Sequence, residues 1–396
     1  MARTRRTALF LASEAGSYST DPSANGSGYV YVPVIGQMSL LKDGLRLLET
    51  NYHTGRNFPT PPVAGPDGWS FDCTVPLNGL STAAGDGVTP VANDWLDILL
   101  THIFGSQTVV DGEGFNAGSN STLWVLDTSP YALQHLIPAF EAGIPSAAPR
   151  TQWGLATADA GSGNYTVAPT QSGNPTTAAI AYGTKAYQFD DDGGNSLAFV
   201  YRQDDVDYTC LGGRCTGATI MAAVGELVVL KLSFAGDTKT QEAKGSLPAI
   251  TANTRTLRSL LSPAWFNNTQ YPTSKIEIDL GITAVVREST QAANGRANYE
   301  LVYAAPKVMI EPIYADAITT LKRAQTAGRL LVQLGGGLLS GGVLNAMAFH
   351  AEQAVAMEAD ATDASGIIRQ GVTFQVTDPV EFSAGVSARY CQLVRA

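Results

Sequence analysis

Along most of the chain, apolar residues occur in short runs that alternate with polar ones, which is the period of a half-buried β-strand. Trp69–Leu77 alternates in this way, and Val224-Gly225-Glu226 is a tight turn between two such runs. The first part of the chain contains predicted strands at 29–35, 69–77, 186–189, 197–202, 216–223 and 227–235. The pattern therefore predicts a mainly β protein.

The second part of the chain has the clearest alternation. Within 275–287, the apolar residues Ile276, Ile278, Leu280 and Ile282 face one way, and Glu277 and Asp279 face the other. Asn294-Gly295 is a strong turn signal, and 298–303 is the predicted partner strand. Further strands are predicted at 329–334, 343–350, 371–377 and 388–394.

Two helices interrupt the predicted strands. The first begins after Pro90 with Asn93 as its N-cap and ends at Gly105. It is apolar nearly all round, which predicts a buried helix. The second is expected over 312–327, with Pro312 in its first turn and Gly328 as its C-cap.

The same order of elements describes residues 29–236 and residues 275–396, once the weakly charged, irregular stretch 106–184 is set aside as an insertion. We therefore expect a duplication. The predicted organisation is a polar N-terminal arm (1–28), a first β domain (29–262) that contains the insertion, and a second β domain (263–396), each domain with a flanking α-helix.

Charge is scarce, and its balance is acidic. Charged residues make up 15% of the 396 residues, against about 25% in an ordinary globular chain, and the net charge is −10. Low charge suits a surface buried against copies of the same chain, although a secreted β protein has a similar composition. The only basic run, with Arg3, Arg5 and Arg6, lies at the N-terminus, so electrostatic binding of nucleic acid is not expected.

Neither export nor membrane insertion is predicted. The apolar run Ala8–Ala12 after those arginines is shorter than a signal peptide needs, and no segment reaches about 18 apolar residues. The four cysteines are too few for a disulfide scaffold in a chain of this length. Assembly inside a cell is the expected setting.

The sequence offers no constellation typical of catalysis. The four histidines stand far apart and form no metal motif, and His102 falls in the buried helix, where a packed, hydrogen-bonded role is expected. Cys210 and Cys215 are interpreted as reduced thiols flanking a turn. We expect no catalytic residue, no cofactor and no metal, and we predict that the protein is not an enzyme.

Two glycine-rich stretches were weighed as binding sites. Asp190–Asn195 lacks the spacing of a calcium loop and is interpreted as a hairpin turn, with weak cation binding left open. The Gly335–Gly342 stretch follows a predicted strand, as a dinucleotide-binding loop does, but a helix precedes it and no βαβ unit surrounds it. We expect it to connect two strands.

Several motifs, taken in order, resemble the tail tube (major tail) proteins of long-tailed bacteriophages. Glu14, Tyr18, Asp21 and Pro22 match the opening "E-x-x-Tyr-G-x-D-P" of that family, with Ser19 in place of its Gly. The hairpin from Cys215 to Gly236 is similar to a family hairpin, although it lacks the usual proline. Further similarities lie in 46–105, in the Glu311-Pro312 segment and at Asp363–Ile367, so the resemblance covers most of the chain outside 106–184.

The resemblance implies β-barrel or sandwich domains that form rings, stacked into a tube through which DNA passes without specific binding. Three chains would complete a ring of six barrels if both halves are tube domains, and six chains if only one is. Other tail proteins would be partners, no membrane is involved, and the protein would reside in the virion tail after assembly in the host cytoplasm. The alternatives are a distal tail or baseplate ring protein, a secreted β-sandwich binding module, and an oxidoreductase built on the Gly335 loop.

Two sets of residues are candidates for this function. An acidic lumen would keep DNA mobile, and Glu277, Asp279 and Glu300, the last across the hairpin, are the expected lumen-facing carboxylates. The loop 51–68 is long and stiffened by proline, and is predicted to contact the next ring. Its candidate contact residues are Tyr52, His53, Arg56 and Phe58.

Overall fold

The structure is a computed structural model in which most of the chain is described. The described residues are 7–14, 18–22, 28–36, 38–39, 41–43, 47–48, 63–64, 68–80, 94–117, 119–120, 122–127, 136–141, 151–159, 161, 163–168, 179–189, 195–203, 206–241, 246–250, 256–259, 262–289, 296–303, 305–312, 322–323, 325–339, 343–364, 367–377 and 391–396.

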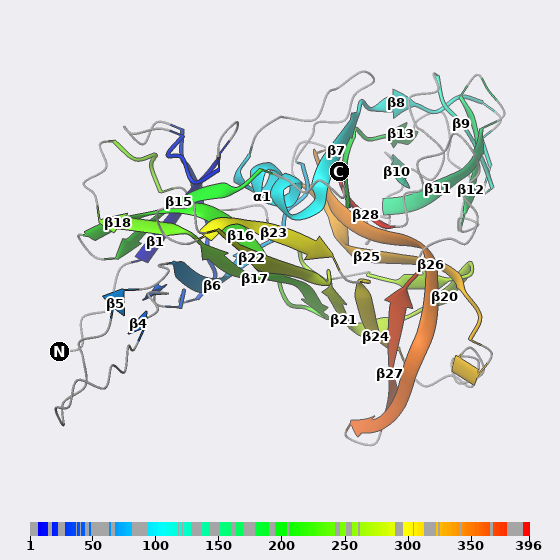
Figure 1. The fold of residues 1–396 in the computed structure, drawn as a ribbon. Coiled ribbons are helices and arrows are strands. Elements are labelled where there is room, and N and C mark those ends of the chain that lie inside the picture. The colour runs from blue at the N-terminus through cyan, green and yellow to red at the C-terminus, as the bar shows by residue number, and fades with distance from the viewer. Residues whose placement is uncertain are drawn as a thin grey trace.

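Strands dominate the described part of the chain, so the predicted mainly β class is confirmed (Figure 1). The first elements are β1 (Thr7–Ser13), β2 (Val30–Val32), β3 (Lys42–Asp43), β4 (Leu47–Leu48), β5 (Val63–Ala64), β6 (Trp69–Pro76), α1 (Trp95–Phe104) and β7 (Gly105–Val110). A separate, smaller sheet follows, which contains β8 (Glu113–Gly114), β9 (Leu123–Val125), β10 (Leu136–Glu141), β11 (Thr151–Asp159), β12 (Asn164–Ala168) and β13 (Ala179–Ala181).

The remaining strands follow the small sheet. They are β14 (Thr184–Phe189), β15 (Leu197–Gln203), β16 (Val206–Ala223), β17 (Val229–Gly236), β18 (Thr238–Gln241), β19 (Ala264–Phe266), β20 (Thr269–Tyr271), β21 (Thr273–Asp279), β22 (Ile282–Glu288), β23 (Arg296–Tyr303), β24 (Lys307–Pro312), β25 (Gly328–Leu339), β26 (Val343–Ala364), β27 (Ile367–Val376) and β28 (Cys391–Arg395). Within the described residues the large sheets are antiparallel, and they do not close into a barrel.

The stretch expected to be an irregular insertion is ordered as a sheet in its described parts. Six strands pair in the order β8-β13-β10-β11-β12-β9 and enclose a separate core that includes Trp124, Leu126 and Tyr165. This sheet lies at one end of the molecule (Figure 1). The first residues of the stretch do not belong to it, because β7 pairs with β14 in the main sheet.

The strand pairings of residues 7–241 recur in residues 264–395. In the first unit, β1 pairs with β2 and β15, β3 with β6, β4 with β5, β6 with β17, and β16 with β15, β17 and β18. In the second unit, β19 pairs with β20 and β25, β21 with β24, β22 with β23, β24 with β27, and β26 with β25, β27 and β28. We call these the first and second repeats. The duplication expected from element order is thus present in the topology.

Irregularities recur as well, which fixes how the two repeats correspond. The register of β16 with β17 shifts between Cys215 and Gly217, and that of β26 with β27 shifts between Ala356 and Glu358. In both cases the residue just before the shift is paired with a buried phenylalanine, which is Phe234 in β17 and Phe374 in β27. A bulge is a local feature of one strand pair, so its recurrence at the same place aligns β16 with β26 residue by residue.

The two repeats share one sheet. β16 of the first repeat pairs with β21 of the second, and β28 pairs with both β26 and β14. The sheet therefore continues across the expected boundary between 262 and 263. The division into 1–28, 29–262 and 263–396 stays a prediction, but residues 7–13 of the expected arm form β1, which is buried between β2 and β15.

The first helix forms where it was predicted, and its cap differs. Helix α1 begins after Asp94, whose carboxylate accepts a hydrogen bond from the Asp97 N–H, so Asp94 and not Asn93 is the N-cap. Gly105 is the C-cap as expected. The second predicted helix falls mostly outside the described residues. Of those described, Pro312 ends β24, and Lys322 and Arg323 are helical.

Three local predictions were wrong. Cys210 and Cys215 flank no turn, because both lie inside β16. The strands on either side of 190–195 do not pair with each other, so no hairpin joins β14 to β15; residues 190–194 lie outside the described part. The run 275–287 is not one strand, since it breaks after Asp279 into β21 and β22.

Candidate functional surface

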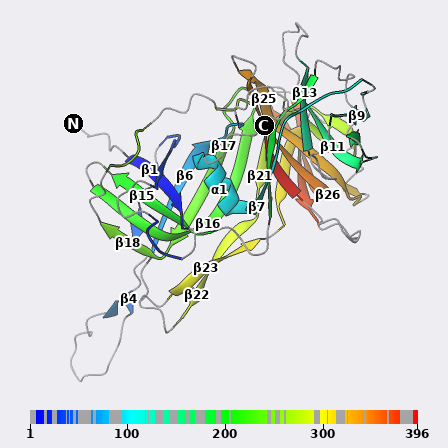
Figure 2. The same ribbon diagram turned by 90° about the horizontal axis from the view of Figure 1, so that it is seen from above.

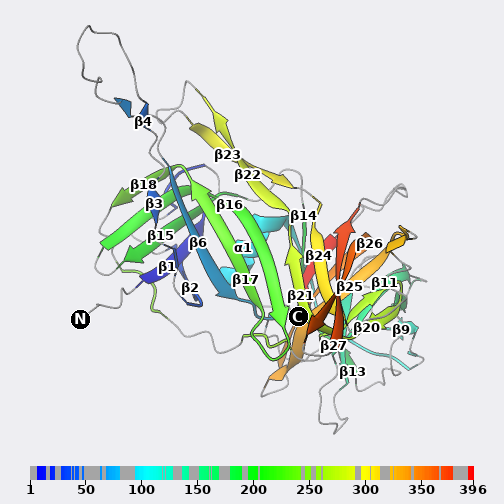
Figure 3. The same ribbon diagram turned by 90° about the horizontal axis from the view of Figure 1, so that it is seen from below.

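The main sheet presents one broad polar face, formed by β6, β17, β16, β21 and β24 lying side by side (Figure 3). Each strand alternates between a buried apolar residue and a residue directed outward, as in Phe71 and Asp72 of β6. Many of the outward residues are polar, and Met221, Val229 and Met309 are apolar exceptions. The inward side chains join α1 in the largest core, so the helix covers the opposite face of the sheet. We refer to the outward side of these five strands as the polar face.

Two of the three expected lumen carboxylates lie on this face. Asp279 is exposed and has Thr219 of β16 on one side and Lys307 of β24 on the other. Glu277 is half-buried, and its carboxylate lies 3.1 Å from the Lys275 ammonium. The alternation predicted for this strand is confirmed, since Ile276 and Ile278 are buried beneath them.

The polar face and its borders carry charges of both signs. The described acidic residues are Asp72, Glu277, Asp279, Glu311 and, on β26 beyond β27, Glu358; the basic residues are Lys42 on the bordering β3, Arg214 of β16, Lys231, Lys275 and Lys307. Acidic and basic side chains are thus balanced. The expected acidic surface is therefore a mixed one, in which neighbouring charges partly neutralise each other.

Glu300 lies apart from the other two carboxylates. It stands in β23 opposite Val285 of β22, and β22 and β23 form a separate two-stranded sheet. Its side chain is exposed and lies 2.9 Å from the Arg287 guanidinium. The hairpin predicted around Asn294-Gly295 is thus present in its strands, but it does not bring Glu300 beside Glu277 and Asp279.

The expected inter-ring residues Tyr52, His53, Arg56 and Phe58 lie outside the described residues. The short strands β4 and β5 that flank them pair with each other. Figures 2 and 3 show β4 and the β22–β23 hairpin leaving the body on the same side of the molecule. The hairpin also exposes apolar side chains, with Val285 54% and Val302 46% accessible.

A shallow, open groove of about 560 Å³ crosses part of the polar face. Met38 and Ser39 form one side, and Asp72, Thr74 and Lys231 form its floor and far side. The Ser39 N–H donates to the Asp72 carbonyl at 3.0 Å, so the segment beside the groove adds to the edge of β6. The groove is open and has a mixed polar and apolar lining, unlike an enclosed small-molecule site.

The histidines and cysteines of the described residues are buried, and His102 is hydrogen-bonded to the backbone on both sides of its ring. His102 Nδ1 lies 2.5 Å from the Asn195 carbonyl, and its Nε2 accepts from the Cys215 N–H, which confirms the expected structural role. Burial lowers the pKa of His102 to about 3 and raises the pKa of Cys215 to about 12. All four cysteines are buried.

The glycine-rich stretch after 334 is part of a strand. Gly335 to Leu339 lie in β25 and pair with β26, so they do not form the loop between a strand and a helix that a pyrophosphate requires. Within the described residues, no group of His, Cys, Asp and Glu side chains could hold a metal ion, and no helix is long and apolar enough to span a membrane.

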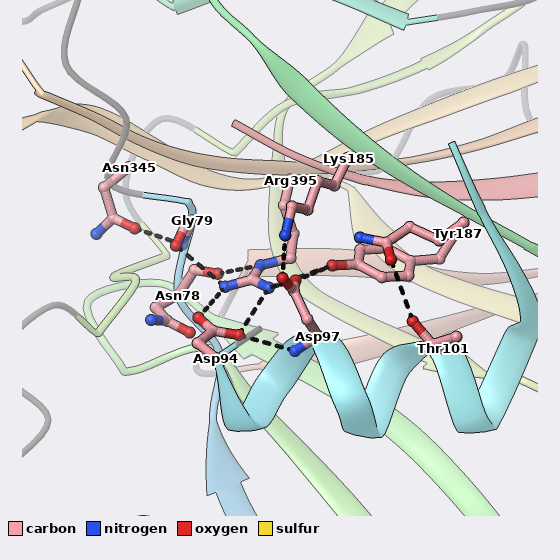
Figure 4. A network of polar contacts seen from close by, with 10 residues as sticks. Asn78, Gly79, Asp94, Asp97, Thr101, Lys185, Tyr187, Asn345 and Arg395 are labelled. Atoms are coloured by element: carbon pink, nitrogen blue, oxygen red, sulfur yellow. Dashed lines mark hydrogen bonds and ion pairs between the residues drawn. The ribbon is translucent and has the colours of Figure 1, made fainter. Parts of the chain in front are cut away.

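A buried ionic network, which sequence reasoning missed, lies at the start of α1 (Figure 4). The guanidinium of Arg395 is fully buried and contacts both Asp94 and Asp97. Lys185 and the Tyr187 hydroxyl also donate to the Asp97 carboxylate. The network thus joins the first turn of α1 to β14 and β28.

The network also holds the turn after β6. Arg395 Nε donates to the Asn78 carbonyl at 3.0 Å, and the Gly79 N–H donates to the Asn345 side chain at 2.5 Å. Burial alone would raise the pKa of Asp94, but the Arg395 guanidinium holds it below its ordinary value. The side chains that contact Asp97 or Arg395 come from positions spread between residues 94 and 395, so no local pattern could have predicted that they meet.

The opening motif residues gather around an irregularity in β16. The Glu14 carboxylate is buried and accepts from the Gly212 N–H, the Ser19 N–H and the Ser196 hydroxyl. Gly212 has a φ of +67°, which favours glycine, and the Tyr18 hydroxyl donates to its carbonyl. This motif therefore anchors the segment after β1 to β16 at Gly212, where the register of β15 with β16 shifts.

No protein-family model and no curated protein matches the chain.

Proposed function

We propose that the chain is a structural, non-enzymatic subunit of a bacteriophage tail tube. Each of its two repeats would act as one tube domain of the barrel or sandwich type. Three chains would form a ring of six such units, and stacked rings would form the conduit for DNA. Its partners would be copies of itself and other tail proteins, in a virion assembled in the host cytoplasm.

The observation that carries this proposal is the tandem repeat joined through a shared sheet. Pairing of β16 with β21 places the two repeats edge to edge, and the polar faces of both run together over β6, β17, β16, β21 and β24. A wall made of like units needs such a junction, one polar surface, and an apolar core behind it.

The polar face is the surface that we assign to the lumen. Its lysines and carboxylates alternate over short distances, so a DNA duplex would meet no extended basic patch to which it could bind. The carboxylates interspersed with these basic residues would repel phosphates within about 8 Å at physiological salt. DNA would therefore pass without specific binding.

The two hairpins, β4–β5 and β22–β23, are the elements that we assign to contacts along the tube. They occupy equivalent places in the two repeats and project on the same side. Val285 and Val302 supply exposed apolar area of the kind that becomes buried in protein interfaces.

Electron microscopy of the purified full-length protein tests the proposal. We expect tubes or stacked rings with threefold symmetry and six similar densities per ring. Single rings that never stack would favour the distal tail or baseplate alternative. A protein that remains monomeric at high concentration contradicts both.

A further inference from the structure

Within the described residues, the main sheet has open edges at β26 and at β3. In the repeat, these strands correspond to β16 and β21, which pair with each other inside the chain. At the internal junction, β16 pairs with β21 on the edge that also holds β15. The counterpart of β16 is β26, and beyond Ala354 the described part of the chain offers β26 no partner except β27. The counterpart of β21 is β3, which pairs only with β6 among the described residues.

We infer that β26 of one chain pairs with β3 of a second copy, in the register of the internal β16–β21 junction. The inference deepens the proposed function, since it names the edges through which copies join, and it rests on that proposal only for the closing of a ring. An extended open strand edge is a surface on which another strand adds by backbone hydrogen bonds.

The recurring irregularities fix the register of this contact. The paired bulges place Asp360 at the position of Thr219, and the pairing of β3 and β21 with their neighbours places Lys42 at the position of Asp279. Thr219 and Asp279 face each other inside the chain. Lys42 of one copy therefore stands opposite Asp360 of the next, which pairs opposite charges across the junction.

Burial along the two edges supports the same contact. Ile278 is fully buried and Ala218 is 2% exposed at the internal junction, where the Leu280 N–H donates to the Ala218 carbonyl at 3.0 Å. Their counterparts at the open edges, Leu41 and Ala359, are only partly buried against the core. Closing the second junction would cover these two apolar side chains as the internal junction covers Ile278 and Ala218.

The hairpins follow the same rule. The β22–β23 hairpin of the second repeat lies against β16 of the first, and the Tyr299 N–H donates to Tyr18 at 3.2 Å (Figure 1). The β4–β5 hairpin has the equivalent place in the first repeat. It would accordingly lie against β26 of the second copy, and each junction would be braced by one hairpin.

Disulfide trapping tests the register directly. Opposed residues of antiparallel strands have Cα atoms roughly 4.5–5.5 Å apart, within the range that a disulfide spans. In the variant carrying Lys42→Cys and Asp360→Cys, mild oxidation should link chains to one another, with a ladder on a reducing-agent-free gel that stops at the trimer. The native cysteines are buried, and burial raises the pKa of Cys73, Cys210 and Cys215, so they should not contribute.

Three controls make the result decisive. Thr219→Cys with Asp279→Cys should link within one chain, which shows that the register is suited to a disulfide. Lys231→Cys with Asp360→Cys should give no link between chains, because Lys231 is exposed but lies in the middle of the sheet. Mixing the two single variants, Lys42→Cys and Asp360→Cys, should give a dimer that contains one of each.

The possible outcomes separate this inference from the proposed function. Tubes in the microscope without a Lys42–Asp360 link, while the internal control forms its disulfide, would overturn the edge pairing and leave the tube. A specific link in a protein that forms neither rings nor tubes would support the edge pairing and contradict the tube. Equal trapping by the Lys231 control would overturn the register.

Discussion

At the scale of single residues, the fold keeps two histidines neutral. His102 and His350 are fully buried, and burial lowers the pKa of each to about 3. His350 Nε2 has no hydrogen-bond partner within the described residues, and it lies 3.7 Å from the Glu352 carboxylate. In an unfolded chain the same imidazoles take up a proton near pH 6.5.

This difference predicts a loss of stability in acid. Because the folded-state pKa lies below the unfolded one, the stabilisation is complete above about pH 6.5 and declines as the pH falls toward 3. Each histidine should contribute a slope of about 1.4 kcal/mol per pH unit within that window. His350→Leu should remove one such slope, as measured by urea unfolding at a series of pH values. Above pH 7 the slopes of the variant and the wild type should coincide, and an unchanged acid slope would contradict the assignment.

Arg395 is the residue on which the buried network depends. Its replacement by Met would leave the Asp97 carboxylate in the core with fewer compensating donors, and breaking a buried ion pair in this way costs about 3–5 kcal/mol. Arg395→Met should therefore lower the free energy of unfolding by about that amount.

Arg287→Met is the matched control for this prediction. Arg287 makes an exposed ion pair with Glu300, which is expected to contribute at most about 1 kcal/mol. Chemical denaturation of both variants gives the comparison, and equal losses of stability would show that the network does not hold α1 against β28.

At the scale of elements, the sequence predicts what depends on local alternation. The buried side of β21, the turn between β16 and β17, and α1 with its C-cap were all predicted, because each depends on neighbours within a few residues. β16 was not recognised as one long strand. Gly212 and Gly213 of this strand resemble a turn. Their segment stays in the sheet because β15 and β18 pair with it and the Glu14 carboxylate accepts a hydrogen bond from the Gly212 N–H.

The candidate surface divides in the same way. The outward direction of Glu277 and Asp279 was predicted from their spacing, whereas the pairing of Asp279 with Lys307 of β24 depends on the topology of the sheet. Glu300 was expected across the hairpin from that strand, but the chain changes sheets after Asp279, and Glu300 lies opposite Val285 of β22 instead. Contacts across more than a hundred residues, such as those of Arg395, follow from topology and leave no periodic signal.

The turn after β6 predicts how tightly β28 docks. A Cβ added to Gly79 would lie 2.3 Å from the Ala396 carbonyl oxygen and 2.5 Å from the Ala346 nitrogen, both backbone atoms. Gly79→Ala should therefore displace β28 and destabilise the protein by about 3 kcal/mol or more, since overpacking typically costs about 1–3 kcal/mol even where side chains can move. Thermal unfolding measures the loss. Gly217→Ala is the control, because its nearest contact would be Ser233 Cβ at 3.8 Å, and similar melting temperatures for the two variants would contradict the packing.

At the scale of the whole molecule, two repeats share one sheet and bring their polar surfaces into a single face. The second repeat contributes Glu277 and Asp279, which lie next to β16 of the first. The junction thus lies in the middle of the surface that we assign to the lumen. A change of charge here would act at the internal junction of every chain in a ring, while leaving the core behind the sheet intact.

Charge reversal at this position tests whether the polar face meets DNA. Glu277→Lys with Asp279→Lys would add to Lys275 and Lys307 and create a basic cluster, which would bind phosphates and release counterions. Particles or tubes built from this variant should keep their form but release DNA more slowly, by tenfold or more at 50 mM salt and by less at 200 mM. Glu300→Lys is the control, because that carboxylate lies on the hairpin and not on the polar face. A slow phase for Glu300→Lys together with normal release for the double variant would move the lumen from the sheet to the hairpin.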